Sequence, residues 1–173
     1  VAGVCVWFSI QCVLPFQHLL YPGDVDWTEE GSRFTWRMML TDKTSALGLF
    51  AVDRETKRVT PIDPTRFLTS WQLEYLGRDP DLLVQFSQFL AEEFRQTEHR
   101  EVAIHAQVFC SLDGRRPQLL VDPKIDLGRQ TRRLGPQPWI VPLSEPLLDS
   151  PWDQPPDDTW GKMLELPDSG PVN

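Results

Sequence analysis

The side chains that could bind a substrate gather in one segment, residues 18–37. This segment carries an imidazole, a hydroxyl, two indoles and two guanidinium groups, at His18, Ser32, Trp27, Trp36, Arg33 and Arg37. A guanidinium group can hold a carboxylate through two parallel hydrogen bonds, and an indole can exclude water from that contact. These residues are therefore our candidates for binding a substrate. The two arginines would serve equally well as partners of lipid phosphates or of Glu29 and Glu30.

A second polar segment, Asp113–Leu127, carries three basic residues that are candidates for contact with a peptide or with lipid, Arg115, Arg116 and Lys124. Together with Arg129, Arg132 and Arg133 they make a basic stretch that could bind anionic lipid, an acidic peptide or the chain's own acidic tail. A structural interpretation of the hairpin itself is favoured, because Gly114 suits a tight turn and Pro123 ends a strand.

The sequence contains no motif of a self-contained catalytic site. It lacks a GxSxG nucleophile elbow, a phosphate-binding glycine loop and an HExxH pair. The three cysteines do not have the spacing of a zinc site, so we expect no metal. Cys110 and His105 lie on an expected strand. We expect Cys110 to be a buried thiol, and His105 to be a surface histidine or one whose hydrogen bonds are satisfied within the fold. The net charge of −8 makes nucleic acid an unfavourable partner.

The chain of 173 residues begins with 23 residues that include no Asp, Glu, Lys or Arg. Its apolar run stops at Pro15, short of the roughly 20 residues that cross a bilayer. We expect residues 1–20 to be the end of a membrane helix, with more protein upstream, because an initiator Met and a basic signal-peptide region are both absent. A buried core helix is the alternative. Three aromatic residues are placed to lie near the bilayer interface, Trp7, Tyr21 and Trp27.

Residues 21–143 alternate strand and helix patterns, which predicts an α+β domain of antiparallel strands covered by one or two helices. Arg33–Leu40 is strand-like, with Ala46–Val52 as a possible hairpin partner, and such a strand would place Arg33 and Arg37 on one face. The segment Thr60–Pro64 should break regular structure, because proline lacks an N–H donor and restricts its predecessor.

A helix is predicted to begin at Asp79 and Pro80, which suit a cap and a first turn. Its apolar positions recur at helical spacing and form one wide core-facing stripe, at Leu82, Leu83, Phe86, Phe89, Leu90 and Phe94. Strict alternation over residues 102–110 then predicts a strand with one face on that helix. Asp113–Gly114 is a strong hairpin signal, and the return strand would be Gln118–Val121.

The tail, residues 144–173, has seven acidic residues and one basic residue, Lys162, so it accounts for −6 of the total charge of −8. Prolines crowd the same stretch. This composition predicts an extended, largely disordered segment. The acidic balance is therefore a property of the tail and says little about what the folded part binds.

The motifs of this chain resemble, in order, those of a known family. They are LPFQHLLYPG from Leu14, WTEEG from Trp27, FTWRMM from Phe34, RDPD from Arg78, SLDGR from Ser111 and WIVPL from Trp139. They resemble the carboxyl-terminal, extramembrane part of the vitamin K-dependent γ-carboxylase family. The resemblance is strongest to its bacterial members, which carry a horizontally transferred transmembrane domain. The acidic tail lies outside the resemblance.

The resemblance implies an integral membrane enzyme, a carbon–carbon lyase, whose extramembrane domain lies on the lumenal or extracytoplasmic side. Such enzymes oxidise vitamin K hydroquinone with O2 and use the strong base so formed to take a γ-proton from peptidyl glutamate, which then captures CO2. The family's catalytic lysine belongs to the membrane portion, so no catalytic residue is expected in this fragment. Membrane lipid and a Glu-containing peptide are the implied partners. A carbanion step needs a dry site with fixed charges, which suits the indoles and arginines of residues 18–37.

One position departs from the family pattern. Bacterial relatives usually have His, and animal enzymes Tyr, where this chain has Ser32, and that position is linked to glutamate handling. Serine supplies neither an imidazole nor a phenol. The alternative function is therefore a membrane-tethered binding or scaffold module that keeps the fold without the carboxylase activity. His18 does match the family pattern.

Overall fold

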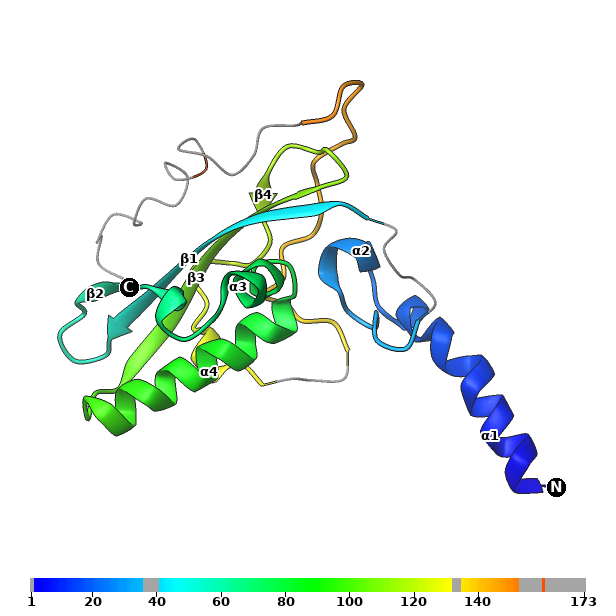
Figure 1. Cartoon of the computed structure of the whole chain (residues 1–173), viewed down its shortest axis with the longest axis horizontal. Helices are drawn as coiled ribbons and strands as arrows, with labels where there is room; N and C mark the ends of the chain where they lie inside the picture. The colour runs from blue at the N-terminus through cyan, green and yellow to red at the C-terminus, as the bar shows by residue number, and fades with distance from the viewer. Residues whose placement is uncertain (1, 36–40, 132–134, 153–159, 161–173) are drawn as a thin grey trace.

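The computed structural model describes residues 2–35, 41–131, 135–152 and 160. It is an α+β fold in which an apolar helix leads into a four-stranded antiparallel sheet with helices packed on it (Figure 1). This confirms the fold class expected from the sequence. The positions Trp36 and Arg37, and most of the acidic tail, lie outside the described residues.

The N-terminal helix α1, Ala2–Val13, extends away from the rest of the domain (Figure 1). It runs directly into a 3₁₀ helix, η1, Leu14–Leu20, at whose start Pro15 removes the N–H that a continuing α-helix would need. None of the residues of α1 is buried. The stretch Ala2–Leu20, with a mean hydropathy of 1.4, is long and apolar enough to cross a membrane. Such exposure does not fit the alternative of a buried core helix.

The sheet has the strand order β2-β1-β3-β4, and all pairs are antiparallel. Its strands are β1, Lys43–Asp53, β2, Val59–Ile62, β3, Val102–Leu112, and β4, Gln118–Leu119. The long pair β1 and β3 is in register from Lys43 opposite Leu112 to Asp53 opposite Val102. An isolated bridge between Val121 and Ile140 extends the pairing beyond β4.

The strand expected at Arg33–Leu40 is wrong for the part that the structure describes. Residues 33–35 lie in a turn, where Phe34 has a φ of 63°, and residues 36–40 lie outside the described part. The partners of β1 are instead β2 and β3. Aromatic and β-branched residues favour strands only weakly, and here the left-handed conformation of Phe34 turns the chain. Arg33 is therefore not on a strand face.

The expected break at Thr60–Pro64 begins later than predicted. Pro61 lies inside β2, opposite Phe50 of β1, and it is tolerated there because β2 is an edge strand. Regular pairing ends at Asp63, whose carboxylate accepts a hydrogen bond from the N–H of Thr65 and starts a 3₁₀ helix, η2, Pro64–Arg66.

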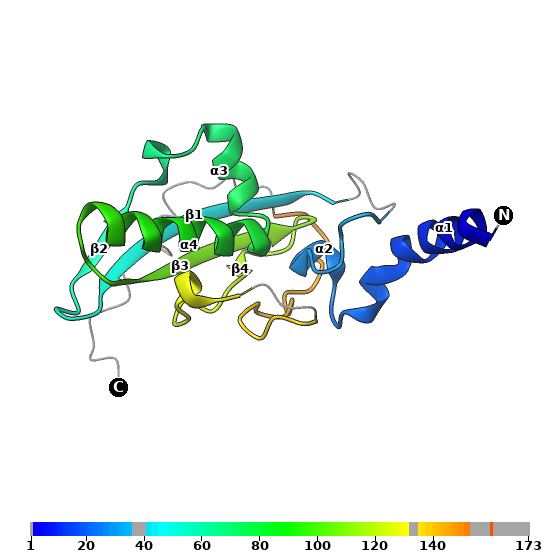
Figure 2. The ribbon, with the colours of Figure 1, turned by 90° about the horizontal axis from the view of Figure 1, so that it is seen from below.

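Two helices follow. The first, α3, Ser70–Leu76, begins with a capping box between Thr69 and Gln72. The second, α4, Pro80–Thr97, begins as predicted, because the Asp79 carboxylate accepts hydrogen bonds from the N–H groups of Asp81 and Leu82 at 2.8 and 3.3 Å. Figure 2 shows α4 lying across one face of the sheet.

The core lies between α4 and the inward face of β3. The helix buries Leu83, Val84, Phe86, Ser87 and Leu90, and alternate residues of β3 from Val102 to Leu112 belong to the same cluster. The predicted stripe is confirmed at Leu83, Phe86 and Leu90, but Phe89 is 48% exposed. A stripe of six apolar residues is wider than the contact of one helix with a sheet, so its edge remains in solvent.

The predicted hairpin after β3 is confirmed. Asp113 and Gly114 have φ values of 51° and 72°, as a tight turn of this kind requires. The return strand is shorter than expected, since β4 ends at Leu119. Beyond it the extended segment around residues 141–145 runs alongside: the Gln118 side chain accepts hydrogen bonds from the N–H groups of Ser144 and Glu145, both at 2.9 Å.

Candidate functional site

The first residues after α1 fold into a compact unit at the base of the domain. A short helix, α2, Val25–Thr28, is capped by Asp24, whose carboxylate accepts a hydrogen bond from the N–H of Asp26. The chain then turns at Glu29, which has a φ of 58°. Residues 29–35 return toward η1, so that two segments close in sequence lie against one another.

Gly31 allows this close approach. A β-carbon at Gly31 would lie 2.8 Å from Cδ2 of Tyr21 and 3.0 Å from Cα of His18, and its φ of +68° is a conformation that favours glycine. The backbone of the loop therefore contacts η1 directly. Because Ser32 follows Gly31, the structure brings the candidate residues His18 and Ser32 into one neighbourhood.

The imidazole of His18 is held in one orientation. Its Nδ1 lies 3.0 Å from the carbonyl oxygen of Pro15. A carbonyl oxygen can only accept, so Nδ1 carries the proton in this contact. In the neutral ring, Nε2 then presents its lone pair as an acceptor on the half-buried side chain. This arrangement suits a residue that accepts a proton or a hydrogen bond from a ligand.

Ser32 and Arg33 belong to the turn that ends the loop. The carbonyl oxygen of Ser32 accepts hydrogen bonds from the N–H and hydroxyl groups of Thr35, at 3.2 and 2.6 Å. The guanidinium group of Arg33 lies 3.6 Å from the carboxylate of Asp81 in the first turn of α4, and its side chain is 49% exposed. Gln17 donates a hydrogen bond to the carbonyl oxygen of Arg33 and so ties the turn to η1. Among the described residues, the ion pair of Arg33 is thus with Asp81.

Trp27 is placed in the core of the domain. Its side chain is fully buried, with 0% exposure, and its indole Nε1 donates a hydrogen bond of 2.7 Å to the carbonyl oxygen of Val141. The indole therefore excludes water from the interior of the domain and connects α2 to the segment after the Val121–Ile140 bridge. No surface for a ligand is formed by its ring.

The three basic candidates of the hairpin are not brought together. Arg115 lies at the tip of the turn, donates a hydrogen bond to the carbonyl oxygen of Leu112 and lies 3.7 Å from the carboxylate of Asp113. Arg116 is exposed beside it. Lys124 follows Pro123, whose carbonyl oxygen contacts His105 in the middle of β3, far from that turn. Arg132 and Arg133 lie outside the described residues.

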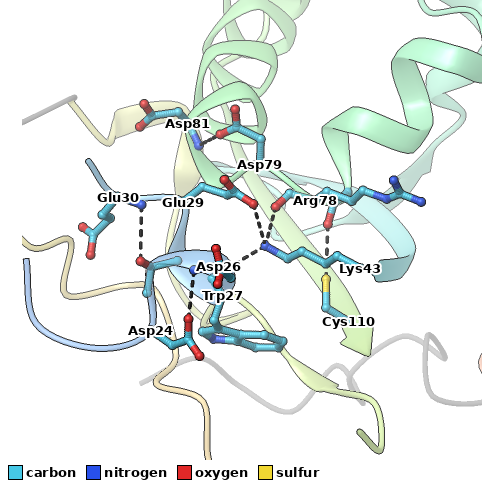
Figure 3. Close-up of polar contacts among 12 residues, drawn as sticks. Asp24, Asp26, Trp27, Glu29, Glu30, Lys43, Arg78, Asp79, Asp81 and Cys110 are labelled. Atoms are coloured by element: carbon cyan, nitrogen blue, oxygen red, sulfur yellow. Dashed lines mark hydrogen bonds and ion pairs between the residues drawn. The ribbon is translucent and has the colours of Figure 1, made fainter. Parts of the chain in front are cut away.

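A buried charged cluster lies beside the loop of residues 24–35 (Figure 3). Its centre is Lys43, at the start of β1, whose side chain is only 4% exposed. The Nζ of Lys43 donates hydrogen bonds to the carbonyl oxygens of Trp27 and Arg78, each at 2.7 Å, and lies 3.6 Å from the carboxylate of Glu29. It also lies 5.7 Å from the centroid of the Trp27 ring.

Burial dominates the electrostatics of this cluster. Desolvation lowers the pKa of Lys43 and raises the pKa of Glu29, and the attraction between the two groups opposes both shifts. The pKa of Asp79 is raised, mainly by burial, although its cap hydrogen bonds favour the charged form. The buried thiol of Cys110, whose Sγ lies 3.3 Å from the carbonyl oxygen of Gly77, has its pKa raised to about 12 by desolvation.

Sequence reasoning missed Lys43, although a signal was present. Lys43 has the same parity as Leu47, Leu49 and Ala51 of β1, and therefore lies on the face of the strand that packs on the helices. A lysine in such a position is rarely buried unless it is paired. The adjacent pair Glu29 and Glu30 does diverge, since Glu29 faces Lys43 while Glu30 accepts a hydrogen bond from the N–H of Gln137 at 2.6 Å.

The described residues hold no group of three or more His, Cys, Asp or Glu side chains that could bind a metal. The two best hollows within them have volumes of about 40 Å³, beside Asp81 and Trp139, and about 180 Å³, beside Arg54 and Arg129. Pockets that enclose an organic cofactor measure roughly 300–1,000 Å³. Neither of these two hollows is large enough to enclose a bound quinone.

Comparison with known proteins gives one family. A family model for the lumenal domain of vitamin K-dependent gamma-carboxylase matches residues 1–146. The match covers α1, the loop of residues 24–35 and the whole sheet, and it ends within the first residues of the acidic tail. No solved structure matches the chain significantly.

Proposed function

Because the chain belongs to the vitamin K-dependent gamma-carboxylase family, whose lumenal domain it contains, we propose that it is the lumenal part of a membrane-bound enzyme that carboxylates glutamate in a peptide or protein. The ordered family match over residues 1–146 is the observation that carries this proposal. The reaction would use vitamin K hydroquinone, O2 and CO2. We place the catalytic lysine and the quinone site in a membrane portion upstream of residue 1.

The geometry supports a division of labour between that membrane portion and this domain. The stretch Ala2–Leu20 is long and apolar enough to cross a membrane and is 6% buried, so its surface is available to lipid or to other helices. The candidate residue His18 lies near the end of this stretch, and Ser32 and Arg33 lie in the loop that follows it. The end of η1 and the loop of residues 24–35 would then lie at the lumenal boundary of the membrane and would face the rest of the enzyme.

The guanidinium group of Arg33 and the imidazole of His18 can both bind the side chain of a glutamate. The half-exposed Arg33 can turn from Asp81 to a carboxylate of the peptide, since both contacts are the same kind of ion pair. The Nε2 atom of His18 can accept a hydrogen bond from the peptide, because the contact of Nδ1 with Pro15 fixes the tautomer. When bound in the membrane portion, vitamin K hydroquinone would supply the strong base. The lumenal residues bind and orient the peptide.

The test is a carboxylation assay on the full-length protein in lipid. It uses reduced vitamin K, ¹⁴C-bicarbonate and a Glu-containing peptide, and it measures both carboxylated peptide and vitamin K epoxide. We expect Arg33→Gln to raise the KM for the peptide by about tenfold, the loss of one charge-assisted contact, with a smaller change in kcat. Arg58→Gln, which removes an exposed arginine in the connection between β1 and β2, is the matched control and should leave KM unchanged.

A folded wild-type protein that forms neither product would remove the enzymatic claim. Ser32 gives weight to a second function, a membrane-tethered module that binds Glu-containing peptides without carboxylating them. Ser32→His, which restores the residue usual in bacterial relatives, separates the two. The enzyme should gain activity or keep it, whereas the module should bind peptide and form no product with either residue.

A further inference from the structure

Among the described residues near the loop of residues 24–35, Lys43 is the most deeply buried charge, and the proposed reaction assigns it no role. Its ammonium group has three N–H donors. Two of them are used by the carbonyl oxygens of Trp27 and Arg78, at 2.7 Å each, and the carboxylate of Glu29 lies at 3.6 Å in the remaining direction (Figure 3). The ammonium group is therefore held by two carbonyl oxygens and paired with one carboxylate of the protein.

These three acceptors come from different parts of the fold. Trp27 belongs to α2, Glu29 is the residue at which the loop turns, and Arg78 lies in the connection between α3 and α4. Lys43 itself begins β1 and, opposite Leu112, belongs to the central strand pair. A single side chain thus connects the loop of residues 24–35 to the sheet and to the start of the longest helix.

We infer that Lys43 is a positioning residue, whose ammonium group holds the loop of residues 24–35 against the sheet and thereby keeps Ser32 and Arg33 beside His18. The chain of contacts runs from Lys43 to the C-terminal end of α2, through Glu29 to Gly31, and from Gly31 to the backbone of His18. The role in substrate binding rests on the proposed function, whereas the role in holding the loop does not.

The cost of burying a charge explains why the contact is decisive. An ammonium group removed from water must be compensated by close acceptors, and the three oxygens provide that compensation only while the loop is in place. If an apolar side chain replaces Lys43, the carbonyl oxygens of Trp27 and Arg78 lose their donor, and the partly buried carboxylate of Glu29 loses its cation. These oxygen atoms would then be better solvated if the loop moved away from the sheet into water.

The experiment is hydrogen exchange on the full-length protein in detergent, which requires no activity. It compares wild type with Lys43→Met, Lys43→Arg and the control Lys124→Met, which removes an exposed lysine. We expect Lys43→Met to speed exchange of the amides of Thr28 and Glu29, which now donate to the carbonyl oxygens of Asp24 and Val25, by about tenfold. Amides of α4 should change by less than twofold, and Lys43→Arg should restore most of the protection.

Two results would overturn the inference. One is unchanged exchange over residues 24–35 in Lys43→Met, and the other is an equal increase in that loop and in α4, which indicates a general loss of stability. If Lys43→Met does not fold, Glu29→Gln decides, because it weakens one contact and leaves both carbonyl bonds. A selective increase in the loop supports the inference, and no increase contradicts it. In the carboxylation assay a selective rise in the KM of Lys43→Met would extend the role to the substrate.

Discussion

Replacement of Trp27 separates a structural role for this residue from a role in contact with a substrate. Its ring is fully buried and its Nε1 donates a 2.7 Å hydrogen bond to Val141. In Trp27→Phe that bond is lost, the carbonyl oxygen is left without this donor, and part of the indole volume becomes a cavity. A lost bond contributes about 1 kcal/mol and an unsatisfied buried group about 1–3 kcal/mol, so we expect a loss of about 2 kcal/mol. Trp27→Ala should cost about 3–5 kcal/mol.

The assay is urea unfolding of the detergent-solubilised protein, followed by far-UV circular dichroism at constant m-value. The matched control is Trp71→Phe on α3, because Trp71 is 66% exposed and its replacement should change the free energy of unfolding by less than about 0.5 kcal/mol. A loss below about 0.5 kcal/mol in Trp27→Phe, equal to that of the control, would refute the placement of this ring in the core. A boundary or substrate contact would then be the better explanation.

Three further predictions concern the packing and charges of the same domain. Phe86→Ala should cost about 3–5 kcal/mol in urea unfolding, whereas Phe89→Ala, at the exposed edge of α4, should cost about 1 kcal/mol or less. A second prediction concerns the thiol of Cys110, tested with both cysteines of α1 replaced by serine. At pH 8 this thiol should react with a maleimide about a thousandfold more slowly in the folded than in the unfolded protein, because its pKa is raised from 9.0 to about 12. A rate near that of a free thiol would contradict its burial. A third prediction concerns Asp79, whose pKa is raised above 3.8, mainly by burial, so that the folded protein loses stability as the pH rises from 3.8 through the folded pKa. Asp79→Asn keeps the cap oxygen and should gain stability relative to wild type over that pH range. Unfolding at a series of pH values measures this, and a difference that does not change with pH would contradict it.

The elements that the sequence predicted well are those whose signals are local. Asp79 and Pro80 mark the start of α4, and the Asp113–Gly114 turn marks the hairpin, because capping and positive φ depend on the residues at those positions. The alternation of β3 was readable for a similar reason. In a strand with one face packed on a helix, successive side chains point alternately toward and away from that helix, so apolar residues recur at every second position.

The features that were missed depend on contacts between distant residues. Arg33–Thr35 has a strand-like composition, but the turn there is set by ties to Gln17 and Asp81. The cluster around Lys43 joins residues that are 16 and 35 positions apart. The inward position of Lys43 on β1 was readable from the sequence, but its partners were not. Of the candidate site, the sequence supplied the candidate residues, and their role in binding stays a prediction. It did not reveal that Gly31 brings them together, because this depends on the backbone of another segment.

The proline in β2 has a consequence for the proposed membrane-bound protein. Under that proposal, tethering by a helix would confine neighbouring copies to a plane, where the open margins of their sheets meet often. A margin that offers an unbroken row of N–H and C=O groups would invite a second copy to add its own strand. Pro61 interrupts that row at the outermost strand and has no N–H to offer. The margin is thereby a poor template, and crowded copies can stay separate without a covering element.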